Sequence, residues 1–158
     1  MTDEPEKIDD LYAVYAVRKA ESTALIQTGL PFRRLMDEVV VPFESGDVFF
    51  LDGASVKSTD LDRIKIIREK SAFRRNLTSL HFNLRTGDAS TKKAIADKYQ
   101  VHLEAVLRDS GEDITSQVIR AFRTQIKPSI KDYLPRREEL LNLAAAFLAE
   151  SLKQLSNT

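Results

Sequence analysis

The sequence predicts a mainly α (α+β) protein in which five to six helices pack as an irregular bundle, with a small antiparallel β-hairpin near residues 47–68. Three observations lead to this prediction. The 158 residues include only five glycines and five prolines, and helices need little turn chemistry between them. Apolar residues recur at helical spacing along most of the chain, and the clearest strand-like patterns are found in residues 47–68. We expect a single domain over residues 1–158, with N-terminal helices and the hairpin in 8–86 and a helical part in 88–158.

The first expected helix runs from about Ile8 to Thr28. Its apolar residues cover a broad face, and Gly29 can supply the left-handed residue that ends a helix. A second, shorter helix is expected from Leu30 onward. Three consecutive valines leave its end open between helix and strand, and Pro42 closes it.

The hairpin is predicted from two neighbouring stretches. Residues 47–53 (Asp-Val-Phe-Phe-Leu-Asp-Gly) have the composition of a strand that ends in an Asp-Gly turn. Residues 61–68 alternate imperfectly between apolar and polar side chains and are expected to form the partner strand. Because a two-stranded ribbon is only marginally stable alone, this hairpin must pack against helices.

The second half of the chain is predicted to be helical. Residues 71–85 fit both a helix and a strand, and a helix is favoured because a Thr-Gly pair, a good helix stop, follows. Further helices are expected over about 91–108 and 114–126, where apolar residues recur every three or four positions. The last helix is expected to have Pro135, a favoured first-turn residue, at its start, and it carries a wide apolar stripe.

The composition excludes several classes of chemistry. Without cysteine the chain has no disulfide, thiolate zinc site, iron–sulfur cluster or cysteine nucleophile. It has no Gly-x-Gly and no Gly-Lys-Ser/Thr sequence, so it lacks the glycine loops that bind phosphates. With His81 and His102 as the only histidines, we expect no metal site and no cofactor. An acidic N-terminus and the lack of a membrane-length apolar run predict a cytoplasmic protein without a membrane partner.

The charges are segregated along the chain, although 24 basic and 24 acidic side chains give a net charge of zero. Residues 57–100 hold eleven basic and five acidic side chains, a net charge of +6, whereas residues 1–10 have a net charge of −4. The positive segment can attract an acidic protein surface or a phosphate backbone. It can also be a solvated face whose Lys and Arg side chains keep a short ribbon from pairing with other chains. No groove-reading or base-stacking motif accompanies it.

Two adjacent aromatic residues form the candidate anchor of a binding surface. In an extended strand Phe49 and Phe50 point to opposite faces, so one can join the core while the other must be covered by a helix, a second subunit or a partner. The candidate binding residues around this anchor are basic side chains of the following segment, namely Arg63, Lys65, Arg68, Arg74 and Arg75.

One short motif suggests catalysis. The seven residues from Arg75 to His81 (Arg-Asn-Leu-Thr-Ser-Leu-His) resemble the Arg-x(4–6)-His motif of HEPN ribonucleases, helical domains in which Arg and His act on the RNA phosphodiester. The resemblance implies a metal-independent ribonuclease with Arg75 and His81 as its catalytic residues. On a regular helix, however, an offset of six residues leaves two side chains on different faces. No other catalytic constellation is found in the sequence.

The sequence therefore predicts a non-enzymatic protein–protein interaction or oligomerisation module that acts through the hairpin and the basic segment 57–100. The expected partner is an acidic protein surface or a second copy of the chain. The alternative is a nucleic-acid-binding protein, in which Arg75 and His81 cleave RNA.

Overall fold

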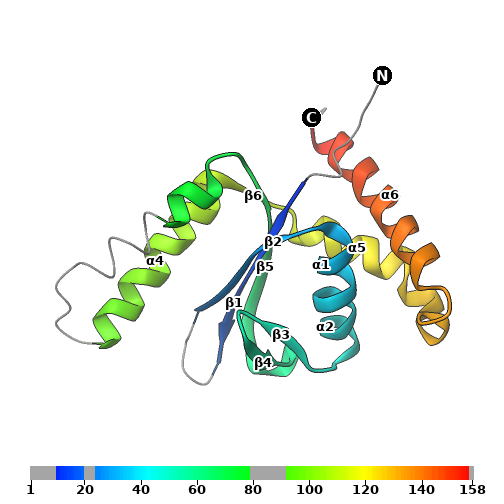
Figure 1. Ribbon diagram of the computed structural model, residues 1–158, viewed down its shortest axis with the longest axis horizontal. Helices are drawn as coiled ribbons and strands as arrows, with labels where there is room; N and C mark the ends of the chain where they lie inside the picture. Colours follow the sequence, from blue (N-terminus) through cyan, green and yellow to red (C-terminus); the bar gives the residue numbers. More distant parts are fainter. Residues whose placement is uncertain (1–9, 20–23, 79–91, 157–158) are drawn as a thin grey trace.

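The computed structural model describes residues 10–19, 24–78 and 92–156, with side chains in the last range described for 101–154. These residues form an α+β fold built on a four-stranded antiparallel sheet in the order β2-β1-β5-β6, with helices on both faces (Figure 1). The predicted fold class, a mainly α bundle with one small hairpin, is therefore wrong. The strands of this sheet are β1 (Tyr12–Arg18), β2 (Ala24–Leu30), β5 (Leu61–Glu69) and β6 (Gly111–Asp113).

Two groups of elements cover the sheet. On the face opposite α4 (Lys92–Ser110), a continuous helical segment packs with two later helices and a separate hairpin. The helical segment consists of α1 (Phe32–Leu35), the π-helix η2 (Met36–Val40) and α2 (Val41–Ser45). The two later helices are α5 (Thr115–Gln125) and α6 (Arg137–Ser156). The hairpin is formed by β3 (Phe49–Leu51) and β4 (Ala54–Val56). The other face is covered by α4 and by the helical residues 73–78. Two short 3-10 turns, η3 (Ser58–Asp60) and η4 (Lys127–Asp132), precede β5 and α6.

The predicted helix from Ile8 to Thr28 is replaced by strands β1 and β2. The sequence of residues 12–17 is Tyr-Ala-Val-Tyr-Ala-Val, and each of these residues is at most 4% exposed. A central strand that is buried on both faces has a continuous apolar run instead of alternation, so its period cannot be told from that of a buried helix. Valine and tyrosine favour strands, and pairing with β2 on one side and β5 on the other decides the outcome.

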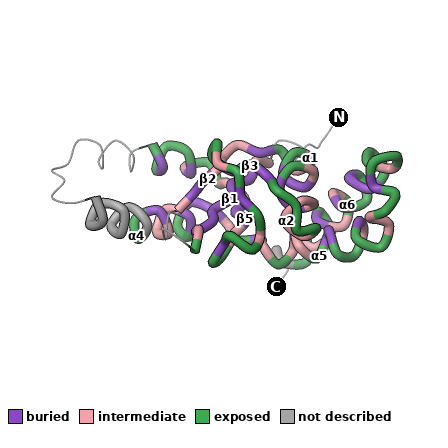
Figure 2. The backbone as a smooth tube through the Cα atoms, turned by 90° about the horizontal axis from the view of Figure 1, so that it is seen from below, coloured by how far each residue is buried: buried purple, intermediate pink, exposed green. Residues whose placement is uncertain are grey.

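The alternating side chains of β1 enter two separate cores. Tyr12, Val14 and Ala16 belong to the larger core, which they share with α5 and α6. Ala13, Tyr15 and Val17 belong to the smaller core beneath α4. Figure 2 shows the buried residues of β1 in the middle of the molecule, between the two helical layers. The central strand thus connects both halves of the fold.

The hairpin exists, but its predicted pairing is wrong. β3 pairs with β4 through a two-residue turn, Asp52-Gly53, in which both residues have positive φ angles of 53° and 78°. Asp-Gly is a sequence that favours this type of turn. The predicted strand over 61–68 is also present, as β5, but it pairs with β1 and β6 instead. β5 therefore pairs with strands that are distant in the sequence, and β3 pairs with β4 instead of with residues 61–68.

The predicted helices of the second half are confirmed where the structure describes them. α4, α5 and α6 match the expected helices over 91–108, 114–126 and after Pro135. Residues 73–78 are helical, and the rest of the 71–85 prediction falls largely outside the described residues. Pro42 does not end the second helix, which continues to Ser45 and stops at Gly46, whose φ is 76°.

Candidate interaction surface and charged pocket

Phe49 and Phe50 lie on opposite faces of β3, as strand geometry requires. Phe49 is 2% exposed and packs edge-on against Phe43, with ring centroids 6.2 Å apart. Phe50 is 69% exposed, and the neighbouring Val48 is 47% exposed. We call the exposed side chains of Val48 and Phe50 the hairpin face. Asp47 and Asp52, the acidic residues nearest to the hairpin face in the sequence, are also exposed.

The hairpin lies beside the open edge of the main sheet. β2 is the terminal strand and, among the described residues, pairs only with β1. The backbone N–H of Asp52 donates a hydrogen bond to Oε1 of Gln27, at 2.9 Å, and so fixes the hairpin turn to β2. The seven residues of β2 (Ala-Leu-Ile-Gln-Thr-Gly-Leu) include no charge and no proline. β2 therefore carries neither of two common protections of an edge strand, charge and proline, although a bulge interrupts its pairing with β1.

The basic side chains predicted around the hairpin are mostly paired within the chain. The Arg63 guanidinium donates to Oε2 of Glu104 at 2.8 Å, and Arg74 Nε lies 3.2 Å from Oε1 of Glu69. Arg68 forms ion pairs with Glu112 and, at 3.8 Å, with Asp10. Arg75 is exposed and Lys65 is half-buried. Three of the five predicted basic binding residues are thus matched by carboxylates of this chain.

The structure does not bring the predicted binding residues onto one surface. Phe49 is part of the core shared with α5 and α6, so the hairpin packs on that face of the sheet. Arg63 and Lys65 face the opposite side, where Arg63 contacts Glu104 of α4. The hairpin and these β5 cations are separated by the sheet itself.

A buried tyrosine and an arginine hold Glu104 in place on the α4 side. The Tyr15 hydroxyl donates to Oε2 of Glu104 at 2.7 Å, the same oxygen that Arg63 contacts. These hydrogen bonds, from Tyr15 first and Arg63 second, lower the pKa of Glu104 and keep it ionised. Burial, together with the hydrogen bond to Glu104, raises the pKa of Tyr15 to about 12. Tyr15 therefore remains a neutral donor at physiological pH.

A similar arrangement lies on the other side of the sheet. The Tyr133 hydroxyl donates to Oδ1 of Asp37 at 2.5 Å, while Arg137 donates to both carboxylate oxygens at 3.0 and 2.6 Å. Hydrogen bonds from Arg137 and from Tyr133 hold the pKa of Asp37 below its usual value. The arrangement joins η2 to the first turn of α6. No local motif could have revealed it, because these residues are about a hundred positions apart.

Replacing Asp37 with asparagine is expected to lower the free energy of unfolding at pH 7 by about 1–2 kcal/mol, since Arg137 is half-exposed and its interaction is partly screened. The folded-state pKa of Asp37 is lower than its unfolded value, so ionised Asp37 stabilises the fold above about pH 4. That contribution is lost as the pH falls through the folded pKa. In urea unfolding at stepwise lower pH, the free energies of unfolding of wild type and variant should converge. A difference that stays constant with pH would contradict the stabilising role of ionised Asp37.

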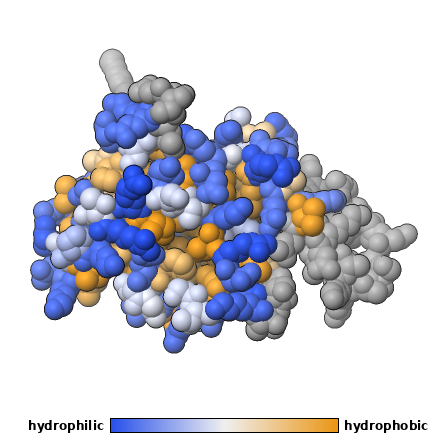
Figure 3. Space-filling view, turned by 180° about the vertical axis from the view of Figure 1, so that it is seen from behind, coloured by the Kyte–Doolittle hydropathy of each residue, from blue (hydrophilic) through white to orange (hydrophobic). Residues whose placement is uncertain are grey.

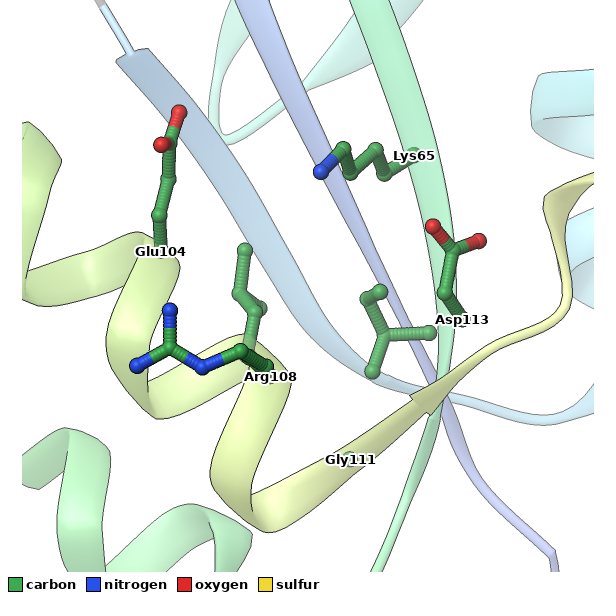
Figure 4. A pocket seen from close by; sticks show the side chains of 7 residues that line it. Lys65, Glu104, Arg108, Gly111 and Asp113 are labelled. Carbon is green, nitrogen blue, oxygen red and sulfur yellow. The ribbon is translucent and has the colours of Figure 1, made fainter.

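A pocket of about 300 Å³ lies between β5, β6 and the C-terminal half of α4. Ile67 and Leu107 form its apolar part, and Gly111 lies at the start of β6. Figure 4 shows Lys65 extending from β5 toward α4, with Glu104 across the pocket and Asp113 near the base of Lys65. The charged residues that line the pocket are Lys65, Glu104, Arg108 and Asp113.

Apolar surface is also found away from the hairpin. Figure 3 shows apolar areas set among hydrophilic side chains on the face opposite to the view of Figure 1. A groove of about 430 Å³ lies between the sheet, α1 and the second half of α6, with Tyr12, Phe32, Leu148 and Leu152 among its lining residues.

The remaining sequence predictions concern catalysis, metals and membranes. Arg75 is exposed within the helical residues 73–78, and His81 lies outside the described residues, so the HEPN-like pair stays a prediction. Within the described part of the chain, no three His, Asp or Glu side chains gather as a metal site would require. None of the helices described has the length and apolar character needed to cross a membrane.

Comparisons with protein-family models, with curated proteins and with solved structures found no match. The class of this protein is therefore defined by its geometry: an antiparallel α+β sheet between two helical layers, with an apolar hairpin face and a charged pocket. Sequence reasoning identified Phe50 and Lys65 but missed the hydrogen bonds between Tyr15 and Glu104 on one side of the sheet and those around Asp37 on the other. Their partners are far away in the sequence and carry no local signature.

Proposed function

We propose that this protein is a non-enzymatic interaction module that self-associates through the hairpin face. The observation that supports the proposal most is the 69% exposure of Phe50 on a structured hairpin. Large aromatic side chains are common anchors of protein interfaces, because they bury much apolar area and lose little side-chain entropy.

The hairpin presents this anchor on a rigid support. The opposite face of β3 is fixed in the core by Phe49 and Leu51, which are 2% and 0% exposed. The turn is held to β2 by the hydrogen bond from the Asp52 N–H to Gln27. A preorganised surface loses little conformational entropy on binding, which favours association.

The chain offers two features that favour a second copy as the partner. Its net charge is zero, so two copies do not repel each other through their overall charge. The uncharged edge of β2 beside the hairpin can accept an identical strand in a symmetric arrangement. A standard protein interface buries roughly 800 Å² per partner, and the edge and the hairpin face together supply a larger contact than Phe50 alone.

The basic segment gives less support to an acidic protein partner than the hairpin face gives to a second copy of the chain. Arg63, Arg68 and Arg74 already contact carboxylates of this chain, so an acidic partner would have to compete with them. The proposal also places the module in the cytoplasm, in keeping with a chain that has no cysteine for disulfides.

Replacing Phe50 with serine is expected to raise the dissociation constant for self-association by about tenfold or more, because an aromatic anchor is lost from the contact. Sedimentation velocity over a wide concentration series measures this constant. The matched control is Leu134→Ser, which removes another exposed apolar side chain, 82% exposed and outside the hairpin. The control should associate like the wild type. A wild type that stays monomeric at every concentration, or equal effects of the two substitutions, would overturn the proposal.

A further inference from the structure

We propose that the pocket between β5 and α4 binds a small zwitterion, a free α-amino acid, with Lys65 facing its carboxylate and Glu104, across the pocket, facing its ammonium group. This inference is independent of self-association through the hairpin. It rests on how the charges of the pocket are arranged and on which of them are already satisfied.

The pocket has the size of a site for a small molecule. Its volume of about 300 Å³ is at the lower end of the usual range for ligand pockets. Ile67 and Leu107 can cover an aliphatic portion of a ligand, while the charged residues surround it. At Gly111 a Cβ atom would collide with the Ile67 side chain and lie 3.1 Å from the Leu107 carbonyl oxygen. Only glycine fits there without shifting two residues that line the pocket.

Lys65 is not neutralised by an ion pair, although two carboxylates line the same pocket. Among the described residues no carboxylate oxygen lies within 4.0 Å of its ammonium group, and no hydrogen bond to that group is found. Lys65 nevertheless extends toward α4 and is only half-exposed (Figure 4). A half-buried lysine whose side chain extends across a pocket is suited to bind an anionic group there.

The two carboxylates are each fixed through one oxygen, which leaves the other available. Glu104 accepts the hydrogen bonds of Tyr15 and Arg63 on Oε2 alone. Asp113 accepts those of the Thr115 backbone N–H and hydroxyl, at 3.0 and 2.6 Å, on Oδ1 alone. No described residue donates to Glu104 Oε1 or to Asp113 Oδ2. Both carboxylates are therefore oriented in advance and keep an acceptor for a cationic group of a ligand.

This arrangement selects against ligands of a single charge. A simple anion at Lys65 would lie close to Glu104 and Asp113, and a simple cation at those carboxylates would lie close to Lys65. A molecule that carries both charges a few bonds apart can place its carboxylate at Lys65 and its ammonium group at Glu104. Arg108, on the last turns of α4, also lines the pocket and pairs with Asp109 at 3.2 Å.

Isothermal titration calorimetry with each standard free α-amino acid at millimolar concentration tests the proposal. At least one amino acid should bind, and its N-acetyl and its carboxamide derivatives should each bind about tenfold more weakly or worse, since each lacks one charge. Lys65→Met should weaken binding to the same extent. The matched control, Lys57→Met, removes an exposed lysine outside the pocket and should bind like the wild type.

Three outcomes would overturn the inference: no heat of binding with any free amino acid, derivatives that bind as tightly as the parent, or a Lys65→Met variant that binds like the wild type. Glu104→Gln provides a second variant, which keeps a hydrogen-bond acceptor for Tyr15 but removes the charge. It should weaken a free amino acid more than its N-acetyl derivative, because only the free amino acid carries the ammonium group. Equal effects on both ligands would also count against the proposed orientation.

Discussion

Replacing Phe49 with alanine is expected to lower the free energy of unfolding by about 3–5 kcal/mol. Phe49 is 2% exposed and packs against Phe43 in the core shared with α5 and α6. Truncation removes the transfer free energy of the ring and leaves a cavity that the surrounding helices can fill only in part. Such a loss is a large share of the stability of a typical domain, about 5–15 kcal/mol. Urea unfolding followed by circular dichroism measures it.

The next residue provides the control for this prediction. Phe50→Ala deletes the same atoms from the same strand, but Phe50 is 69% exposed, so the stability should change by no more than about 0.5 kcal/mol. Both variants should be measured at a protein concentration low enough to prevent self-association, because association stabilises the folded state. If the two variants lose similar stability, the assignment of β3 side chains to core and surface is incorrect.

The sequence could predict those parts of the fold that depend on local patterns. α4, α5 and α6 have one face toward the core and one toward water, so their apolar residues keep the helical period. The turn at Asp52-Gly53 depends on its two central residues alone. Strand geometry likewise separates Phe49 from Phe50 without knowledge of any partner.

The strands of the main sheet could not be predicted in the same way. β1 is buried on both faces, which removes the alternation that would distinguish it from a helix. β5 has the expected strand character, but its partner was taken to be the nearest candidate in the sequence. Its real neighbours, β1 and β6, are about fifty residues away on either side, and pairing over that distance depends on the whole fold.

The candidate site was only partly visible in the sequence for a related reason. The charge of segment 57–100 was counted without knowing which carboxylates would approach it. Glu104 and Glu112 lie outside that segment and pair with Arg63 and Arg68 only after folding. Lys65 was identified as basic, but its distinction from its paired neighbours comes from the pocket that β5 and α4 form together.

Introducing aspartate at either Ala13 or Ala16 is expected to abolish the folded state. Both residues are 0% exposed, and they belong to different cores on the two faces of β1. A buried carboxylate without a partner costs several kcal/mol, and the added volume must also be accommodated in a close-packed interior. Together these costs approach the whole stability of a typical domain.

The pair of substitutions tests the central position of β1, which the sequence alone assigned to a helix. Ala146→Asp is the control, because Ala146 is exposed on α6 and should tolerate the charge with a change of about 0.5 kcal/mol or less. Thermal unfolding followed by far-ultraviolet circular dichroism compares the three variants. Helices cover both faces of the strand, so Ala13→Asp and Ala16→Asp should both lose the cooperative transition. If only one loses it, the face of β1 that tolerates the charge is open to water, and the two-layered covering of the sheet does not hold.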